Sequence, residues 1–343
     1  MNRMQKAASL ALAALMAAGL CACGENATWA AKYGEATVPA GVYITGLMTE
    51  YNELIGQAPA DAKDPLKAEV EEGVTLSQAI TQAAKDRLND YIAVEEQFAA
   101  QALELAPEDQ AAVESGMTGW EFFRTTYEEN GVSEASYRLV MENSAKQQRL
   151  FEATYGPGGS QEVPESELRG YFNENYAKVL MIPLTFSTSE DPETKESADQ
   201  HTREVMDGFY RQLQEGADME DVYYEARKLA TGNEELARPE PGTSYTFVNK
   251  QNTTYDQVLV DAIFSAQVGE PVQVETDGGL YLFVRYDLEE NPQDFEGYRD
   301  SILMALKREE FLAQVDEWAA ALTGVTYNEE ALGRYTPEKL KFA

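Results

Sequence analysis

The sequence has very little histidine and cysteine, and this scarcity excludes several classes of enzyme. Its 343 residues include one histidine, His201, and two cysteines, Cys21 and Cys23, both close to the N-terminus. Zinc hydrolases use two or three histidine ligands, and a Ser-His-Asp or Cys-His enzyme would depend on His201 alone. We expect His201 to be a solvated surface residue, because it stands in a polar stretch. The chain after Cys23 can form no internal disulfide and has no thiol nucleophile, and we expect no metal site.

Basic residues are also scarce. The chain has 27 basic and 60 acidic residues and a formal net charge of −33. A field of this sign repels nucleic acid, so we expect no nucleic-acid partner. The glycine-rich loops that bind nucleotide phosphates are missing as well, and we expect no cofactor. The chain is longer than a single hydrophobic core usually spans, which predicts two domains or one domain inserted into another.

The first 22 residues have the composition of a secretory signal. A basic start is followed by an apolar run that ends at Leu20 and is too short to span a bilayer. The run continues into LCACG, which resembles a bacterial lipobox. The resemblance implies lipidation of Cys23, cleavage just before it, and anchoring to the extracytoplasmic face of the cell membrane. An ordinary signal peptide with an incidental cysteine is the alternative.

Hydrophobic periodicity indicates a helical region, a mixed region and a last helix. Helices are expected at 40–55, 76–105, 107–130, 133–154 and 164–175, with an exposed loop at 57–75. The mixed region is expected to have strands at 178–186, 245–248, 272–275 and 280–286, and helices at 198–215, 218–230 and 254–267. The last helix, 295–322, is apolar along one side and should pack back on the first helices.

These segments predict an α+β fold. A mainly helical lobe, built from the N-terminal helices and the C-terminal helix, is interrupted by a small α/β domain. The expected boundaries are a signal peptide at 1–22, the first part of the helical lobe at 23–175, the α/β domain at 176–291, and the C-terminal helix and tail at 292–343.

Three segments resemble PrsA-type foldase lipoproteins and SurA-type periplasmic chaperones. AKYGEATVPAGVYITGLM resembles the opening of these proteins, and VPESELRGYFNENYAKVLMI resembles the segment that leads into their parvulin-type peptidyl-prolyl isomerase domain. LVDAIFSAQVGEPVQVETDGGLYLFV resembles the end of a parvulin domain and is the most specific of the three. The resemblance implies a helical chaperone lobe with an inserted parvulin-like domain.

The resemblance also implies a proline pocket. Carried over position by position, its residues are Met181, Phe247, Tyr255, Leu259 and Tyr281. Parvulin sites have two histidines, whose positions are taken here by Met181 and Tyr281. Prolyl isomerisation needs no nucleophile, because its barrier of about 18–20 kcal/mol comes from amide resonance and falls when a pocket desolvates and twists the amide. Plain core packing is the alternative role for Phe247, and equally for Tyr255, Leu259 and Tyr281.

The principal expectation is therefore a lipid-anchored extracytoplasmic chaperone that binds unfolded secreted proteins. An active peptidyl-prolyl isomerase with an atypical pocket is the first alternative, and acceleration of proline-limited refolding would distinguish it. A cell-wall hydrolase using two carboxylates is the second, and a deep cleft with two buried carboxylates would favour it. A solute-binding or structural lipoprotein is the third, and a closed two-lobed α/β cleft would favour solute binding.

Overall fold

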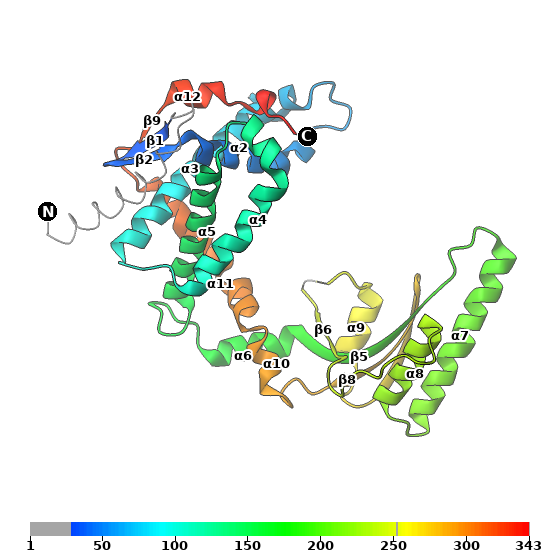
Figure 1. Ribbon diagram of the computed structural model, residues 1–343. Helices are drawn as coiled ribbons and strands as arrows, with labels where there is room; N and C mark the ends of the chain where they lie inside the picture. Colours follow the sequence, from blue (N-terminus) through cyan, green and yellow to red (C-terminus); the bar gives the residue numbers. More distant parts are fainter. Residues whose placement is uncertain (1–28, 252, 343) are drawn as a thin grey trace. The chain divides into compact units, whose positions relative to one another are not determined.

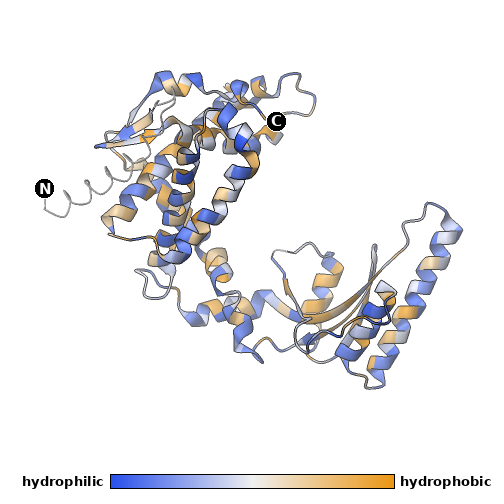
Figure 2. Cartoon of the chain, in the orientation of Figure 1, coloured by the Kyte–Doolittle hydropathy of each residue, from blue (hydrophilic) through white to orange (hydrophobic). Residues whose placement is uncertain are grey.

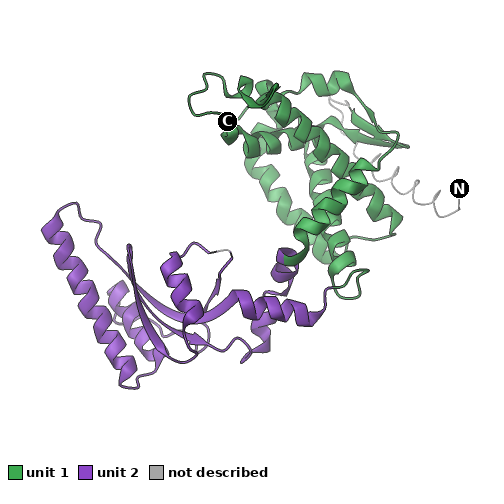
Figure 3. Ribbon diagram, turned by 180° about the vertical axis from the view of Figure 1, so that it is seen from behind, with its two compact units in different colours: residues 1–162, 306–343 green, residues 163–305 purple. Residues whose placement is uncertain are grey.

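The computed structural model describes residues 29–251 and 253–342, which form two compact units (Figure 3). Unit 1 comprises the described residues up to Glu162 together with those from Leu306 onwards, and unit 2 runs from Val163 to Ala305. Both ends of the chain therefore contribute to unit 1. Cys23, the predicted lipidation site, lies outside the described residues. No helix in the described ranges is both long and apolar enough to cross a membrane.

Unit 1 is mainly helical (Figure 1). Its principal helices are α2 (Ala40–Leu54), α3 (Leu76–Ala100), α4 (Pro107–Glu129), α5 (Glu134–Tyr155) and, from residue 306, α11 (Arg299–Ala320). Hydrophilic and hydrophobic residues alternate along these helices (Figure 2), as expected for helices that bury one side. A capping box between Thr75 and Gln78 begins α3, and the Ser133 hydroxyl caps α5. Local sequence therefore determines where these helices begin.

The end of the chain completes a small sheet in unit 1. The strands β1 (Trp29–Tyr33), β2 (Ala36–Pro39) and β9 (Thr326–Tyr327) are antiparallel in the order β2-β1-β9, and α12 (Glu329–Arg334) follows. Further along, the Asn130 side chain binds the backbone of Lys341. Its Nδ2 donates to the Lys341 carbonyl oxygen at 2.7 Å, and its Oδ1 accepts from the Lys341 amide at 2.9 Å. The last segment of the chain is thus hydrogen-bonded to the C-terminal end of α4.

Unit 2 has a four-stranded antiparallel sheet in the order β6-β5-β8-β7. Its main elements are β5 (Tyr176–Thr185), α7 (Pro192–Gln214), α8 (Met219–Thr231), β6 (Thr246–Asn249), α9 (Gln257–Ser265), β7 (Pro271–Thr276) and β8 (Gly279–Tyr286). Successive side chains of β5 point to opposite faces. Leu180 and Ile182 pack with residues of α7 and α8, whereas Val179 and Met181 pack with residues of α9. The sheet is therefore covered on both faces.

Aromatic side chains join the shorter helices of unit 2 to its sheet. These helices are α6 (Glu165–Asn175) and α10 (Pro292–Glu296), and Tyr298, which directly precedes α11, belongs to the same cluster. The ring of Phe172 on α6 lies 5.8 Å from Phe295 of α10 and 5.9 Å from Tyr298. Tyr298 also lies 5.0 Å from Tyr176 at the start of β5. This cluster packs both ends of the unit 2 segment against each other.

The α+β class is confirmed, but several boundaries differ from the prediction. α7 begins at Pro192 rather than near 198, because the Asp191 carboxylate accepts from the Thr194 amide at 2.8 Å and proline suits the first helical position. The expected helix 295–322 is broken at Gly297 into α10 and α11. The segment predicted as an exposed loop and the tail also contain short elements: η2 (Ile55–Gln57), η3 (Pro65–Lys67), β3 (Glu69–Glu71), β4 (Val74–Thr75) and η4 (Pro337–Lys339).

Candidate functional site

The side of the unit 2 sheet that α9 covers is the first candidate site, and we call it the α9 face. Leu259 and Ile263, one helical turn apart on α9, are fully buried against the sheet. Arg285 of β8 donates from Nη1 to the carbonyl oxygens of Phe264, at 3.0 Å, and Ala266, at 3.3 Å. These carbonyls belong to the end of α9, where no helical amide remains to bond them. The arginine therefore holds the C-terminal end of α9 on β8.

Four of the five predicted pocket residues lie on the α9 face. Met181 and Leu259 belong to its buried cluster, and Tyr255 and Tyr281 pack against that cluster while remaining partly exposed. Met181 and Tyr281 reach the same face because they stand at odd-numbered positions of β5 and of its partner β8. The structure therefore brings these four side chains together on one side of the sheet.

Phe247 lies elsewhere. It pairs in register with Lys178, an even-numbered residue of β5, and so points away from α9. Its ring lies 5.1 Å from Tyr298 and 6.5 Å from Phe172, in the aromatic cluster described above. The contacts of Phe247 are therefore those of core packing, which is the alternative that its sequence context left open.

The chemistry of the α9 face differs from that of a histidine-based site. Met181 is 8% exposed and presents a thioether, and Tyr281 presents a phenol. His201 is exposed on α7, a helix whose apolar side packs on the opposite face of the sheet. In the part of the chain that the structure describes, no group of histidine, cysteine and acidic residues could hold a metal ion. The α9 face thus offers apolar and aromatic contact surface.

A second candidate site is a cavity of about 580 Å³ in unit 1, which we call the bundle cavity. It is bordered by α2, α3, α5 and α11. Its apolar lining includes Val42, Val94, Val140, Leu312 and Val315. Leu312 is 38% exposed, and the lining residues Glu53 and Asp316 are exposed, so the cavity opens to solvent. It is large enough to take several side chains of a bound chain.

Acidic side chains predominate among the charges of the bundle cavity. Five carboxylates line it, from Glu50, Glu53, Asp86, Asp90 and Asp316, against the guanidinium groups of Arg87 and Arg308. Arg87 is bound within this set, since its Nη2 lies 2.5 Å from the Glu50 carboxylate and 3.5 Å from that of Glu53. Gly46 on α2 permits this arrangement, because a Cβ there would come within 3.3 Å of Arg87 Cδ. The cavity keeps an excess of negative charge.

The surroundings of Asp90 in the cavity shift the pKa of its carboxyl group. Burial raises its pKa to about 6, the charges of Asp316, Asp86 and Glu50 add to the rise, and Arg87 opposes it. The largest cause is desolvation, which disfavours the charged form. Asp90 is therefore ionised at neutral pH but becomes protonated in mild acid.

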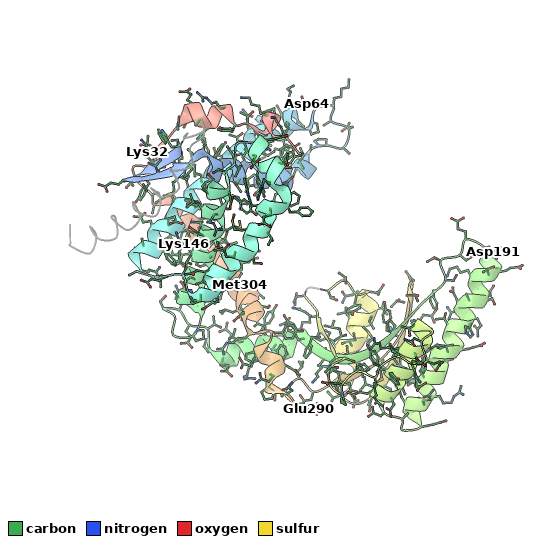
Figure 4. All side chains as sticks on the ribbon, in the orientation of Figure 1. Lys32, Asp64, Lys146, Asp191, Glu290 and Met304 are labelled. Carbon is green, nitrogen blue, oxygen red and sulfur yellow. The ribbon has the colours of Figure 1, made fainter. Side chains whose placement is uncertain are left out.

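A buried ion pair stands behind the cavity between α3 and α5. Lys146, which Figure 4 labels among the helices of unit 1, lies with its Nζ 2.7 and 2.9 Å from the two carboxylate oxygens of Glu95. Asn143, a lining residue, donates from Nδ2 to Glu95 and to the Tyr91 carbonyl oxygen, both at 3.0 Å. The Glu95 carboxylate thus accepts hydrogen bonds from both Lys146 and Asn143, as a buried charge requires.

The sequence interpretation did not identify the bundle cavity. Asp86 and Asp90 are four residues apart in a predicted helix, so the sequence does indicate that they lie on the same side of that helix. Which helices face that side depends on packing among segments as distant in sequence as α2 and α11, and periodicity contains no such information.

Comparison with known proteins finds likeness only among solved structures: no family model and no curated protein matches the sequence. A foldase protein PrsA from Lactococcus lactis aligns at 13% identity and a TM-score of 0.39, covering 90% of this chain and 99% of that one. A foldase protein PrsA from Streptococcus pneumoniae aligns at 11% identity and a TM-score of 0.41, covering 74% and 88%. A peptidylprolyl isomerase PrsA from Bacillus anthracis aligns at 13% identity and a TM-score of 0.26, covering 75% and 97%. The chain is thus similar, at low identity, to structures of PrsA foldases.

Proposed function

We propose that the protein is a lipid-anchored extracytoplasmic foldase that binds unfolded secreted proteins. The observation that carries this function is the bundle cavity, which is open to solvent and combines an apolar lining with an excess of carboxylates. Unfolded chains expose apolar side chains, which such a lining can cover. The net charge of −33 keeps a complex with an exposed client soluble. Cys23 supplies the anchor in this proposal, through the lipobox-like motif.

The parvulin-like unit has a binding role in this proposal. The positions of the two parvulin histidines hold Met181 and Tyr281, which supply apolar and aromatic contact on the α9 face. A prolyl segment could rest on such a surface, but the two hydrogen-bonding imidazoles are absent from it. Turnover is therefore expected to be poor, while affinity for a peptide is retained.

Leu312 provides the test of client binding. The chain without its predicted signal peptide is expected to suppress aggregation of a reduced, unfolded protein at equimolar concentration, as measured by light scattering. Leu312→Gln should raise the amount of protein required by about fivefold, because part of a leucine's transfer free energy is lost. Leu229→Gln is the matched control, since Leu229 is 58% exposed on α8 and does not line the cavity. Equal loss in both variants, or no suppression by the parent chain, would contradict the proposal.

A second experiment distinguishes the isomerase alternative. We expect the slow, proline-limited refolding phase of a permanently unfolded test protein to keep its rate constant when a substoichiometric amount of the chain is added. The physical reason is that neither Met181 nor Tyr281 provides an imidazole on the α9 face. Acceleration would establish an active isomerase, and Met181→Ala and Tyr281→Phe would then locate its pocket.

Two buried carboxylates in a deep cleft would favour a glycoside hydrolase, but Glu50 alone is buried among the five carboxylates that line the bundle cavity. Such an enzyme uses one carboxylic acid as proton donor and a second carboxylate as nucleophile or base. Glu50, the buried carboxylate of the set, accepts from Nε of Arg87 at 2.6 Å and from its Nη2 at 2.5 Å. The arrangement therefore favours binding over hydrolysis.

A further inference from the structure

The bundle cavity has an electrostatic asymmetry that specifies a ligand class. Arg87 is engaged by Glu50 and Glu53, on the α2 side of the cavity. The carboxylates of Asp86 and Asp90, on α3, and Asp316, on α11, make no salt bridge with Arg87 in the described part of the chain, although the charge of Arg87 still acts on Asp90. Of the opposite sign, Arg308 alone remains among the lining residues. Three carboxylates in this part of the cavity therefore have one guanidinium group to balance them, and a cationic ligand would supply the missing positive charge.

The apolar lining of the cavity restricts the class of ligand further. Val94 and Val315 are buried, and Leu312 borders the opening. A lysine or arginine side chain has an aliphatic stem that packs on apolar surface and a charged end that seeks an anion. A small inorganic cation would make no use of the valine and leucine wall. The combination of wall and carboxylates therefore matches a basic side chain.

Burial strengthens the attraction at Asp90. Its carboxylate is partly withdrawn from water, and a charge pair gains more energy where the effective dielectric constant is low. The charges that act on it are those of Asp86 and Arg87 on its own helix, Glu50 on α2 and Asp316 on α11. The cavity is also lined by Glu53 on α2, Arg308 on α11 and the neutral Asn143, Ser144 and Gln147 of α5. Three of the four charged neighbours are acidic, so an incoming cation relieves repulsion as well as gaining a partner.

We infer that the bundle cavity binds a lysine or arginine side chain of an extended client segment, with its aliphatic stem on the Val94, Leu312 and Val315 wall and its charge between Asp90 and Asp316. This inference rests on the proposed function and names the class of client that the cavity selects. The cavity volume of about 580 Å³ exceeds one such side chain, so neighbouring client residues enter with it. Acid releases the client, because protonation of Asp90 below a pH of about 6 removes one of the two charges.

The test uses two fluorescently labelled, unstructured peptides that are identical except for one central lysine or glutamine. Fluorescence anisotropy with the signal-free chain should give about tenfold tighter binding of the lysine peptide at neutral pH and about 0.15 M salt, where charges beyond about 8 Å are screened. Asp90→Asn should reduce this preference about fivefold at neutral pH. Lowering the pH to about 5 should reduce the preference of the parent chain by a similar factor, but should hardly reduce that of the variant any further. Asp90→Asn is expected to fold, because it removes a charge whose burial is unfavourable.

Asp61→Asn is the matched control, since Asp61 is an exposed carboxylate of unit 1 that does not line the cavity. It should leave the preference within about twofold of the parent value, as a screened surface charge does. Equal affinity for the two peptides, or an equal loss in Asp61→Asn and Asp90→Asn, would overturn the inference in favour of general attraction to an acidic chain. If light scattering shows suppression of aggregation without any preference for lysine, the proposed function stands and this inference fails. If the chain prefers the lysine peptide but does not suppress aggregation, this inference stands and the proposed function fails.

Discussion

Replacing Lys146 by methionine is expected to destabilise unit 1 by about 3–5 kcal/mol, because it leaves the Glu95 carboxylate buried without its cation. Lys146 and Glu95 are 6% and 4% exposed, and water cannot replace the missing partner. Asn143 still donates one hydrogen bond to Glu95, but an amide does not neutralise a charge. The double variant Lys146→Met/Glu95→Leu should recover most of the loss, because a well-packed apolar pair can match a buried ion pair.

Tryptophan fluorescence measures this effect in unit 1 alone. The three tryptophans, Trp29, Trp120 and Trp318, all belong to unit 1, so the urea transition that they report is that of the helical unit. Arg138→Met is the control on the same helix, because Arg138 pairs with Glu114 at the surface and such pairs contribute below about 1 kcal/mol. A loss in Lys146→Met no larger than that of the control would show that the pair is unimportant for the bundle.

Replacing Gly279 by alanine is expected to destabilise unit 2 by about 3 kcal/mol or more. Gly279 begins β8 with a φ of +156°, and it pairs with Thr185 of β5 and Thr276 of β7. A Cβ at this position would collide with the Leu184 carbonyl oxygen and lie 2.9 Å from Thr185 Cα. Both obstacles are backbone atoms, so the side chain can be accommodated only by moving β5 away from β8.

Gly278→Ala, one residue earlier, is the matched control for this effect. A Cβ there would meet no atom within 4 Å, so stability should change by less than about 0.5 kcal/mol. Hydrogen exchange of the β5 and β8 amides in increasing urea measures the opening of the sheet, and the tryptophan transition of unit 1 serves as an internal reference. Undiminished protection of these amides in Gly279→Ala would contradict the predicted collision.

Local signals were sufficient for much of the fold. The strand predicted at 280–286 agrees with β8 because its apolar residues are flanked by a clear turn, DGG. β9 was missed because it has only two residues, too few for any periodicity. The face on which Phe247 lies could not be predicted, because β6 has four residues whose face depends on the register with Lys178, and register is a property of pairing rather than of one strand.

The candidate sites were predictable to different degrees. The residues of the α9 face could be proposed from the sequence, because Met181 and Tyr281 take the positions of the two parvulin histidines in segments that resemble that family. The bundle cavity could not, because it depends on the contact of Gly46 on α2 with Arg87 on α3 and on the placement of Asp316 near Asp90. Such tertiary contacts leave no pattern in either helix alone.

The pairing of β1 with β9 and the bonds between Asn130 and Lys341 have a consequence for the order in which the chain matures. A chain that emerges with its N-terminus first exposes residues 29–162 well before residues 306–342 have emerged, whereas unit 2 is a continuous segment that emerges completely at an earlier stage. Unit 2 can therefore fold while the last part of the chain is still emerging, whereas unit 1 waits for the final strand. During that interval the apolar sides of α2, α3 and α5 are themselves exposed, so a protein proposed to shield unfolded chains is, in its own biogenesis, a chain that needs shielding.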